Sequence, residues 1–429
     1  MSSVGSVVLA GIVVESAADF QTRTGLRQML EAARRYTLAI YAHLTPEQLQ
    51  VPQWPTVNPP LWELAHIGWF QEYWCRRMRP GRAPLPSRYP HFDDWYNSSV
   101  IPHATRWTLP HPPMSGVIRQ LDETLEDTLA ALERVDVDQC YGFALAALHE
   151  FMHAEALLMT LQTLALPAPP HLRSRDDSDD NGAAAAPASA DIAFEGGALA
   201  VGSAPNATHF VFDNEKWAHR VMVSPFAMAT ACVTNAQFAE FVDDGGYRIE
   251  AWWSDQGSRW LRASAAKHPA YWRNDGSAWL ARRFDQWDAL DKAAPVVHVN
   301  LHEAMAYCAW ARRRLPTETE WEWAARAGDD RRYPWGADAT LLARCTLGAR
   351  LTRPAPAARA DPELGSLLHL VGNVWEWTAS AFLPYPGFAP DPYADYSAPW
   401  FGNHQVMRGG SLFTARALVH NRFRNFYLP

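Results

Sequence analysis

Residues 167–192 divide the chain into two stretches of different sequence character. Pro, Ala, Asp and Ser dominate this segment, which includes DDSDDNG at 176–182 and then an alanine run. Such a composition cannot bury enough apolar surface to fold, so we predict a mobile linker here. Because 429 residues also exceed the usual size of one hydrophobic core, we predict a domain at 20–166 and another at 193–429, after a disordered N-terminus at 1–19.

Four amphipathic helices are predicted in the first domain, because apolar residues recur there at spacings of three and four. The second helix is expected to begin with Asn58 as its N-cap and Pro59 in its first turn. The third carries an apolar stripe at Ile118, Leu121, Leu125, Leu129 and Leu132. The helices are expected at 21–44, from 58 to beyond 73, at 114–134 and at 141–164. Four such helices favour a four-helix bundle.

The second domain is predicted to be an irregular α+β domain, because it combines many Gly and Trp residues with short apolar segments. Three short helices are expected, and capping boxes at 234–237 and 317–320 begin two of them. Most of the 20 tryptophans are expected to pack in cores, although such rings can also surround a cationic ligand.

Two histidines, His149 and His153, lie four residues apart in the fourth predicted helix. Positions i and i+4 share one helix face about 5–6 Å apart, so both imidazoles can reach one metal ion. His66 lies on the inward, aromatic face of the second helix. Buried imidazoles are costly unless satisfied, and bundles commonly hold metals between facing helices. We therefore predict a metal site at these three histidines, with Glu155 placed to orient one of them through a hydrogen bond.

The same helix also matches H-E-x-x-H, the pattern of zinc peptidases, in which Glu150 would be the general base. This alternative needs a further ligand downstream. After Glu155, however, no glutamate follows until Glu195, beyond the predicted linker. Three imidazoles suit zinc, iron or copper, so the spacing alone leaves the ion open.

The composition excludes several classes of protein. A net charge of -8 gives no support for binding to nucleic acid or to an anionic membrane. The five cysteines are far apart and form no C-x-x-C, which argues against a disulfide framework and fits a reducing cytoplasm. The early apolar run at 7–14 is shorter than the roughly 20 residues of a membrane helix. The composition does not exclude binding of small polar or zwitterionic ligands.

Four motifs in the second domain resemble the formylglycine-generating-enzyme (sulfatase-modifying-factor) domain, in the same order. They are PFAMATACVTNAQF at 225–238, RLPTETEWE at 314–322, GNVWEWT at 372–378 and RGGS at 408–411. The resemblance implies an irregular domain of C-type-lectin-like fold. Formylglycine enzymes use a cysteine pair near the C-terminus, and no cysteine follows Cys345 here, so that activity is not expected.

The first domain, with a separate histidine and then His-x-x-x-His-x-Glu, resembles the DinB-like bundle. Together the two domains resemble the ergothioneine-synthase family of sulfoxide synthases over nearly the whole chain. In that family Fe(II), held by three histidines, binds hercynine (Nα-trimethylhistidine) and a chalcogen donor, and O2 is used to join sulfur to imidazole C2. The resemblance implies that His66, His149 and His153 are iron ligands.

Further residues follow from the same resemblance. Asn425 and Phe426, followed by Tyr427, occupy the segment that holds the ammonium and carboxylate end of hercynine. The tyrosine that delivers a proton should be Tyr393 or Tyr396, and we favour Tyr393.

The predicted donor rests on two departures from relatives that use γ-glutamylcysteine. Those relatives carry an Arg-rich segment after the second helix and a Gln just before the last histidine. Here the segment is VIPHATRW at 100–107, with Arg106 as its one arginine, and the second position is Met152. Together with Trp107, Arg106 suits a neutral, polyhydroxylated donor. The pattern resembles the selenoneine synthase branch, which implies a selenosugar donor and a C–Se bond at C2 of hercynine.

Two other functions stay open. A sulfur-using ergothioneine synthase would use cysteine or γ-glutamylcysteine as the donor, and a non-enzymatic chain would combine a binding module with a metal store. The chain also ends at Leu428-Pro429, where relatives continue to a Gly-Phe-Arg strand, so we expect either a shortened C-terminus or a different last edge.

Overall fold

The computed structural model describes residues 20–136, 140–173, 190–207 and 209–429. The chain divides into two compact units. The first comprises Met1–Ser174 with the short segments Thr208–Phe210 and Ala415–Ala417, and the second comprises the rest. The predicted disordered N-terminus and most of the predicted linker lie outside the described residues.

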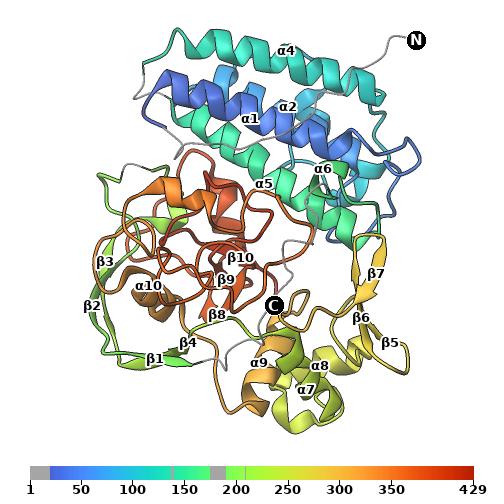
Figure 1. Cartoon of the computed structure of the whole chain (residues 1–429). Helices are drawn as coiled ribbons and strands as arrows, with labels where there is room; N and C mark the ends of the chain where they lie inside the picture. Colours follow the sequence, from blue (N-terminus) through green and yellow to red (C-terminus); the bar gives the residue numbers. More distant parts are fainter. Residues whose placement is uncertain (1–19, 137–139, 174–189, 208) are drawn as a thin grey trace. The chain divides into compact units, whose positions relative to one another are not determined.

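Four long helices form the first unit, as predicted (Figure 1). They are α1 (Arg23–Tyr41), α2 (Pro60–Glu72), α4 (Met114–Leu132) and α5 (Tyr141–Thr163). Helix α1 packs on α5, while α2 packs on both α4 and α5. The shorter elements are the π-helical turn η1 (Tyr73–Arg77), α3 (Phe92–Tyr96), the 3-10 turn η2 (His103–Trp107) and α6 (Pro170–Arg173). Helix α6 lies within the predicted linker segment and buries Leu172.

Two details of the predicted helices are wrong. Asn58 is not the N-cap of α2; Pro59 takes that position, and Asn58 Oδ1 accepts a hydrogen bond from Arg106 instead. The buried face of α4 is rotated from the predicted leucine stripe. It consists of Val117, Leu121, Thr124, Thr128 and Leu132. Two of these five are threonines, which a search for apolar residues passes over.

Where the structure describes it, the second unit contains four small antiparallel sheets joined by loops. Strand β1 (Asp191–Phe194) pairs with β4 (Phe226–Ala229), and β2 (Gly197–Val201) pairs with β3 (His219–Val223). A three-stranded sheet contains β5 (Trp272–Asn274), β6 (Trp279–Arg283) and β7 (Gln286–Ala289). Another contains β8 (Glu376–Ala381), β9 (Gln405–Arg408) and β10 (Asn425–Tyr427). This arrangement is the predicted irregular α+β domain.

The described residues of the second unit contain four helices rather than the three predicted: α7 (Asn235–Asp243), α8 (Asp255–Ser264), α9 (Leu301–Trp310) and α10 (Glu318–Arg326). Both predicted capping boxes are present, at Thr234 and Thr317. A third capping box joins Asn300 to Glu303 at the start of α9. The usual capping-box pattern has Ser or Thr at the cap, so it does not predict a box that begins with Asn.

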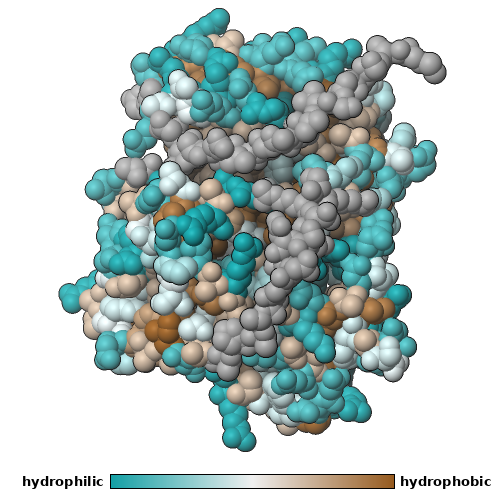
Figure 2. All heavy atoms as spheres, in the orientation of Figure 1, coloured by the Kyte–Doolittle hydropathy of each residue, from teal (hydrophilic) through white to brown (hydrophobic). Residues whose placement is uncertain are grey.

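Figure 2 shows one face of the molecule, on which hydrophilic residues predominate and hydrophobic ones form small, separate patches. Within the described part of the chain, we find no helix that combines the length and the apolar character needed to cross a membrane.

Candidate metal centre

The structure brings the three predicted histidines together inside the first unit. His66 comes from α2, and His149 and His153 come from successive turns of α5. One ring nitrogen from each histidine lies within 4.8 Å of the other two. The Nε2 atoms of His149 and His153 are 3.1 Å apart. The ring centroid of His66 is 5.1 Å from that of His149 and 5.0 Å from that of His153.

Hydrogen bonds to the outer nitrogens fix which atom of two rings faces the cluster. The Nδ1 of His66 lies 2.7 Å from the carbonyl oxygen of Tyr96. The Nδ1 of His153 lies 2.7 Å from Oε1 of Glu63. A carbonyl and a carboxylate only accept hydrogen bonds, so each Nδ1 is the donor and each Nε2 keeps a lone pair for a metal.

Aromatic side chains hold two of the rings in place. His66 stacks between Trp62 and Trp69, at centroid distances of 4.9 and 5.7 Å. His149 stacks on Phe70 at 3.5 Å, with the planes only 4° apart. Because these rings cannot rotate freely, the nitrogen cluster is arranged before any ligand arrives.

Burial also sets the charge of the cluster. It holds the pKa of His66 and of His149 well below the ordinary value, and the neighbouring imidazole of His153 adds to the effect. Both rings are therefore neutral at physiological pH, which is the form that binds metals. Three imidazoles with one ring nitrogen each in the cluster fit a zinc, iron or copper ion that keeps open positions for other ligands.

Glu150, the glutamate of H-E-x-x-H, is held in the bundle interior. Its Oε1 accepts a 2.9 Å hydrogen bond from Nε of Arg34, whose Nη2 also donates to Gln71 at 2.6 Å. Only 2% of the Glu150 side chain is exposed. This ion pair argues against a general base at Glu150, and with it against the zinc-peptidase alternative.

The sequence analysis did not identify Glu63 as the partner of one of the three histidines and named Glu155 for such a role. Glu63 precedes His66 by three residues, on the same face of α2, and this spacing is the signal that could have identified it. Glu155 is buried on α5 and helps to raise the pKa of Tyr36, after burial itself. Its role in orienting a ligand stays a prediction.

The residues predicted to bind the chalcogen donor are Arg106, Trp107 and Met152, and they have different contacts. The guanidinium of Arg106 lies 4.0 Å from the ring centroid of Trp62, the ring on which His66 stacks. Trp107 donates from Nε1 to the carbonyl of Val51 at 2.9 Å. Met152 is half-buried, immediately before His153 on α5.

The predicted residues of the second unit gather around one aromatic cluster. The ring of Tyr396 lies 6.2 Å from Tyr393 and 6.0 Å from Phe426 on β10. Tyr396 also stacks on Phe212 at 4.4 Å. Asn425 precedes Phe426 on β10, and Tyr427, which follows it, is 36% exposed.

Both tyrosines keep their protons at neutral pH. Burial raises the pKa of Tyr393, and the nearby Asp395 adds to this. Burial also raises the pKa of Tyr396 well above its ordinary value, assisted by Glu215 and Asp213. A phenol in this state can donate a proton but is not a base at neutral pH.

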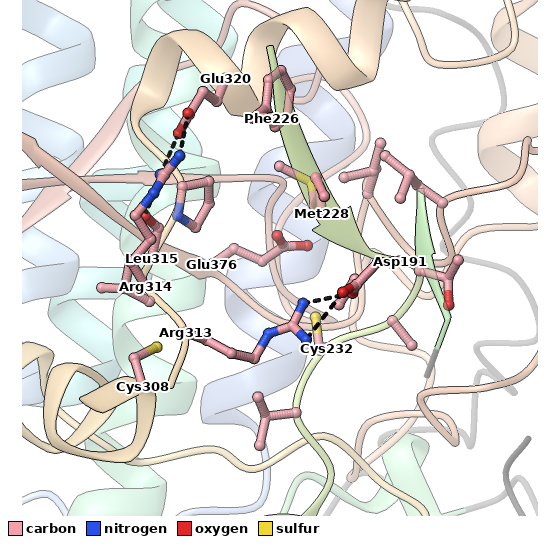
Figure 3. Close-up of a pocket in the computed structure, with 18 of the residues that line it drawn as sticks. Asp191, Phe226, Met228, Cys232, Cys308, Arg313, Arg314, Leu315, Glu320 and Glu376 are labelled. Carbon is pink, nitrogen blue, oxygen red and sulfur yellow. Dashed lines mark hydrogen bonds and ion pairs between the residues drawn. The ribbon is translucent and has the colours of Figure 1, made fainter. Parts of the chain in front are cut away.

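A separate cavity of about 430 Å³ lies in the second unit and contains none of the predicted site residues (Figure 3). Two ion pairs border it, Arg313 with Asp191 and Arg314 with Glu320. Glu376 points into the space between them and accepts a 3.1 Å hydrogen bond from Nε1 of Trp321. Burial raises the pKa of Glu376 to about 7.

Two family models match the chain. The DinB superfamily model matches residues 29–162, which include the three histidines. The sulfatase-modifying factor enzyme 1-like domain model matches residues 178–428. The predicted fold, a DinB-like helical domain followed by a formylglycine-enzyme-like α+β domain, is thus confirmed.

Whole-chain similarity is found with hercynine oxygenases. The protein of Mycolicibacterium thermoresistibile is 34% identical, over 98% of this chain and 94% of its own length. That of Mycolicibacterium smegmatis is 34% identical, over 95% of this chain and 96% of its own length. A formylglycine-generating enzyme of Streptomyces coelicolor is 33% identical, over 55% of this chain and 81% of its own length.

Proposed function

The chain belongs to the hercynine oxygenase family, and from this premise we propose that it is an iron(II)- and O2-dependent oxidoreductase acting on hercynine. The proposed reaction joins the selenium of a selenosugar to imidazole C2, on the way to selenoneine. The observation that carries the proposal is the cluster of His66, His149 and His153, whose ring nitrogens lie within 4.8 Å of one another.

The histidines would hold iron(II) through their inward nitrogens. Bound iron would supply a centre at which O2 is activated beside imidazole and donor. The chain's own residues prepare this centre. Trp62, Trp69 and Phe70 immobilise two ligand rings and surround them with apolar surface, which excludes water from the reacting groups.

The second unit would bind hercynine and manage a proton. Asn425 and Phe426 are proposed to hold its ammonium and carboxylate end, with Tyr427 beside them. An aromatic face attracts a quaternary ammonium without a hydrogen bond, which suits Phe426 to this role. Tyr393 is proposed as the proton donor and Tyr396 as the alternative, because both phenols keep their protons at neutral pH.

A balanced reaction uses one O2. The C2–H bond of hercynine and the Se–H bond of the donor break, and one C–Se bond forms. O2 takes up four electrons: one of its oxygen atoms leaves as water with the two hydrogens, and the other stays on selenium as a selenoxide. The sulfur analogue of this balance gives a sulfoxide.

The donor assignment rests on Arg106 and its surroundings. Within the described residues, Nε of Arg106 is buried without a hydrogen-bond partner, while Nη1 donates to Asn58 at 2.7 Å. A buried N–H without a partner favours a ligand that supplies an oxygen acceptor. A sugar hydroxyl meets this need without bringing a negative charge. Met152 adds a soft, polarizable thioether one residue before His153, and Trp107 offers a face on which a sugar ring can stack.

A sulfur donor is the second candidate, and Arg106 is also the observation that favours it. A guanidinium can bind a carboxylate through two parallel hydrogen bonds, and both cysteine and γ-glutamylcysteine carry carboxylates. One arginine can bind one carboxylate in this way, whereas γ-glutamylcysteine has two carboxylates.

Competing donors can test the assignment directly. The full chain is reconstituted with Fe(II) without oxygen and mixed with hercynine and equal amounts of a 1-selenosugar, cysteine and γ-glutamylcysteine. O2 is then admitted, and the products are identified by mass spectrometry. The selenium adduct of hercynine is expected to dominate, with hercynine consumed only when both Fe(II) and O2 are present.

Two results would contradict the proposal at different levels. Turnover of γ-glutamylcysteine without any selenium adduct would replace selenoneine synthesis by the sulfur reaction. No consumption of hercynine with any donor, in protein shown to contain iron, would remove the hercynine assignment itself.

A further inference from the structure

The outer nitrogens of two predicted iron ligands have chemically different partners. His66 donates to a peptide carbonyl, that of Tyr96, whereas His153 donates to the carboxylate of Glu63. The donor–acceptor distance is 2.7 Å in both hydrogen bonds. The carbonyl is neutral, but the carboxylate carries a full negative charge. A histidine bonded to a carboxylate gains electron density and becomes the more basic ligand.

His153 is also the histidine with the least support from ring stacking. His66 stacks on Trp62 with the planes 8° apart, and His149 stacks on Phe70. In the described part of the chain, the ring contacts of His153 are edge-on contacts with the other two histidines. Its side chain is 19% exposed. The hydrogen bond to Glu63 is therefore what sets the orientation of this ring.

Glu63 is well placed to fix another residue, because it is immobile itself. Only 1% of the residue is exposed, and it lies on α2, one helical turn before His66. Helix α2 therefore supplies one proposed ligand and the support of another, and it packs directly on α5, which carries His153. A movement of α2 would displace both groups together.

We propose that Glu63 is a positioning residue that fixes His153 and supplies a negative charge to a ligand set made only of imidazoles. This inference rests on the proposed iron centre. In sites of two histidines and one carboxylate, the carboxylate brings the negative charge directly to the metal. In this chain the charge lies one hydrogen bond further out, which leaves the metal position free for a substrate or O2.

Two substitutions separate the charge from the hydrogen bond. Glu63→Gln keeps the length and an acceptor oxygen but removes the charge, whereas Glu63→Ala removes both. Glu72→Gln is the matched control: Glu72 lies on the same helix, is 1% exposed, and accepts hydrogen bonds from Ser87 and from the backbone N–H of Arg88. Glu72 also pairs with Arg77 at 3.5 Å, but Arg77 keeps a closer partner in Asp93, at 2.6 Å. Far-UV circular dichroism and thermal unfolding establish that each variant is folded.

The measurement is metal binding without hercynine or O2. The affinity for Co(II) and Fe(II) is measured anaerobically against a chromophoric chelator, and the visible ligand-field bands of bound Co(II) are recorded. Loss of an outer-shell partner costs roughly 10–100-fold in metal affinity. Glu63→Ala should lie in this range, Glu63→Gln should lose less affinity but shift the Co(II) bands, and Glu72→Gln should match the wild type in both.

The proposal is overturned if Glu63→Ala binds Co(II) as tightly as the wild type. If Glu63→Gln matches the wild type in affinity and spectrum while Glu63→Ala does not, the role proposed for the charge is refuted. Only the role of the orienting hydrogen bond then remains. Either result, in a wild type that consumes hercynine, leaves the proposed function intact. If the wild type binds Co(II) with the expected variant effects but never consumes hercynine, the proposed function fails and the role of Glu63 stands.

Discussion

Arg34 and Glu150 form an ion pair in the interior of the helical bundle, with 2.9 Å between Nε and Oε1 and with at most 3% of either side chain exposed. Glu150 directly follows His149, so the pair ties the turn of α5 that carries a proposed ligand to α1. Gln71 extends the network to α2. A sequence pattern typical of zinc peptidases thus serves to join three helices.

Glu150→Gln should destabilise the protein strongly, because it leaves the charge of Arg34 buried without its partner. Removing one member of a buried ion pair typically costs about 3–5 kcal/mol. Chemical denaturation measures the free energy of unfolding. Replacing both members together, as Arg34→Met with Glu150→Leu, should restore much of the loss. Unchanged stability of Glu150→Gln would show that the pair contributes little.

His66→Ala should abolish stoichiometric iron binding while the bundle stays folded. The remaining pair on α5 offers two nitrogens, which is too few for a stable centre of this kind. Iron content is measured after anaerobic reconstitution and gel filtration. His91→Asn is the control, since His91 is exposed and its φ of 65° is one that asparagine tolerates. Full iron content in His66→Ala would remove His66 as a ligand.

Stability should depend on pH through Glu303, whose pKa is raised from 4.5 to about 7 by burial, although hydrogen bonds from Tyr247 and the backbone of Asn300 oppose the shift. Between these values the folded protein keeps a proton that the unfolded chain has released. The free energy of unfolding therefore falls as pH rises across this range. Glu303→Gln should flatten that slope in denaturation measured from pH 4 to 8, because glutamine does not titrate and still fits the capping box.

Glu320, at the equivalent position of another capping box, should show the opposite sign. Burial favours its protonated form, but Arg314 and the backbone of Thr317 hold its pKa below the ordinary value. Its contribution to stability is present above the pKa of the unfolded chain and is lost as pH falls through the folded value. Glu320→Gln should therefore lower the free energy of unfolding at neutral pH, and it should lower it less at acidic pH. Parallel slopes for the Glu303 and Glu320 variants would contradict both assignments.

Tyr393→Phe should slow turnover without loss of iron, because the ring is kept and only the proton donor is removed. General acid catalysis typically contributes about 10²–10⁴-fold, so kcat should fall within this range at saturating hercynine and donor. Tyr396→Phe should have the smaller effect. The reverse ranking, with equal iron content, would transfer the role to Tyr396.

The parts of the fold that could be predicted are those governed by short sequence spacings. The 3.6-residue period revealed the four long helices and placed His149 and His153 on one face. It also put His66 on the buried face of α2. The predicted N-cap of α2 was wrong because the side chain of Asn58 accepts a hydrogen bond from Arg106, 48 residues later in the sequence.

Contacts between distant segments explain the rest of what was missed. Glu63 and His153 are 90 residues apart, and only the packing of α2 on α5 brings them together. The predicted residues of β10 and the two tyrosines came from resemblance alone. Their gathering around the ring of Tyr396 depends on tertiary structure, which no local spacing encodes.

Arg106→Leu should raise the KM for the donor without changing iron content. Leucine keeps an apolar contact with Trp62, but it removes the hydrogen bond to Asn58 and the buried Nε. Loss of a charge-assisted hydrogen bond costs about 1.5–3 kcal/mol, so the KM should rise about 10- to 150-fold. Steady-state kinetics with the selenosugar and with γ-glutamylcysteine then distinguish the donors. A larger effect on γ-glutamylcysteine would show that Arg106 binds a carboxylate and would favour the sulfur reaction, whereas an unchanged KM for both donors would remove Arg106 from the donor site.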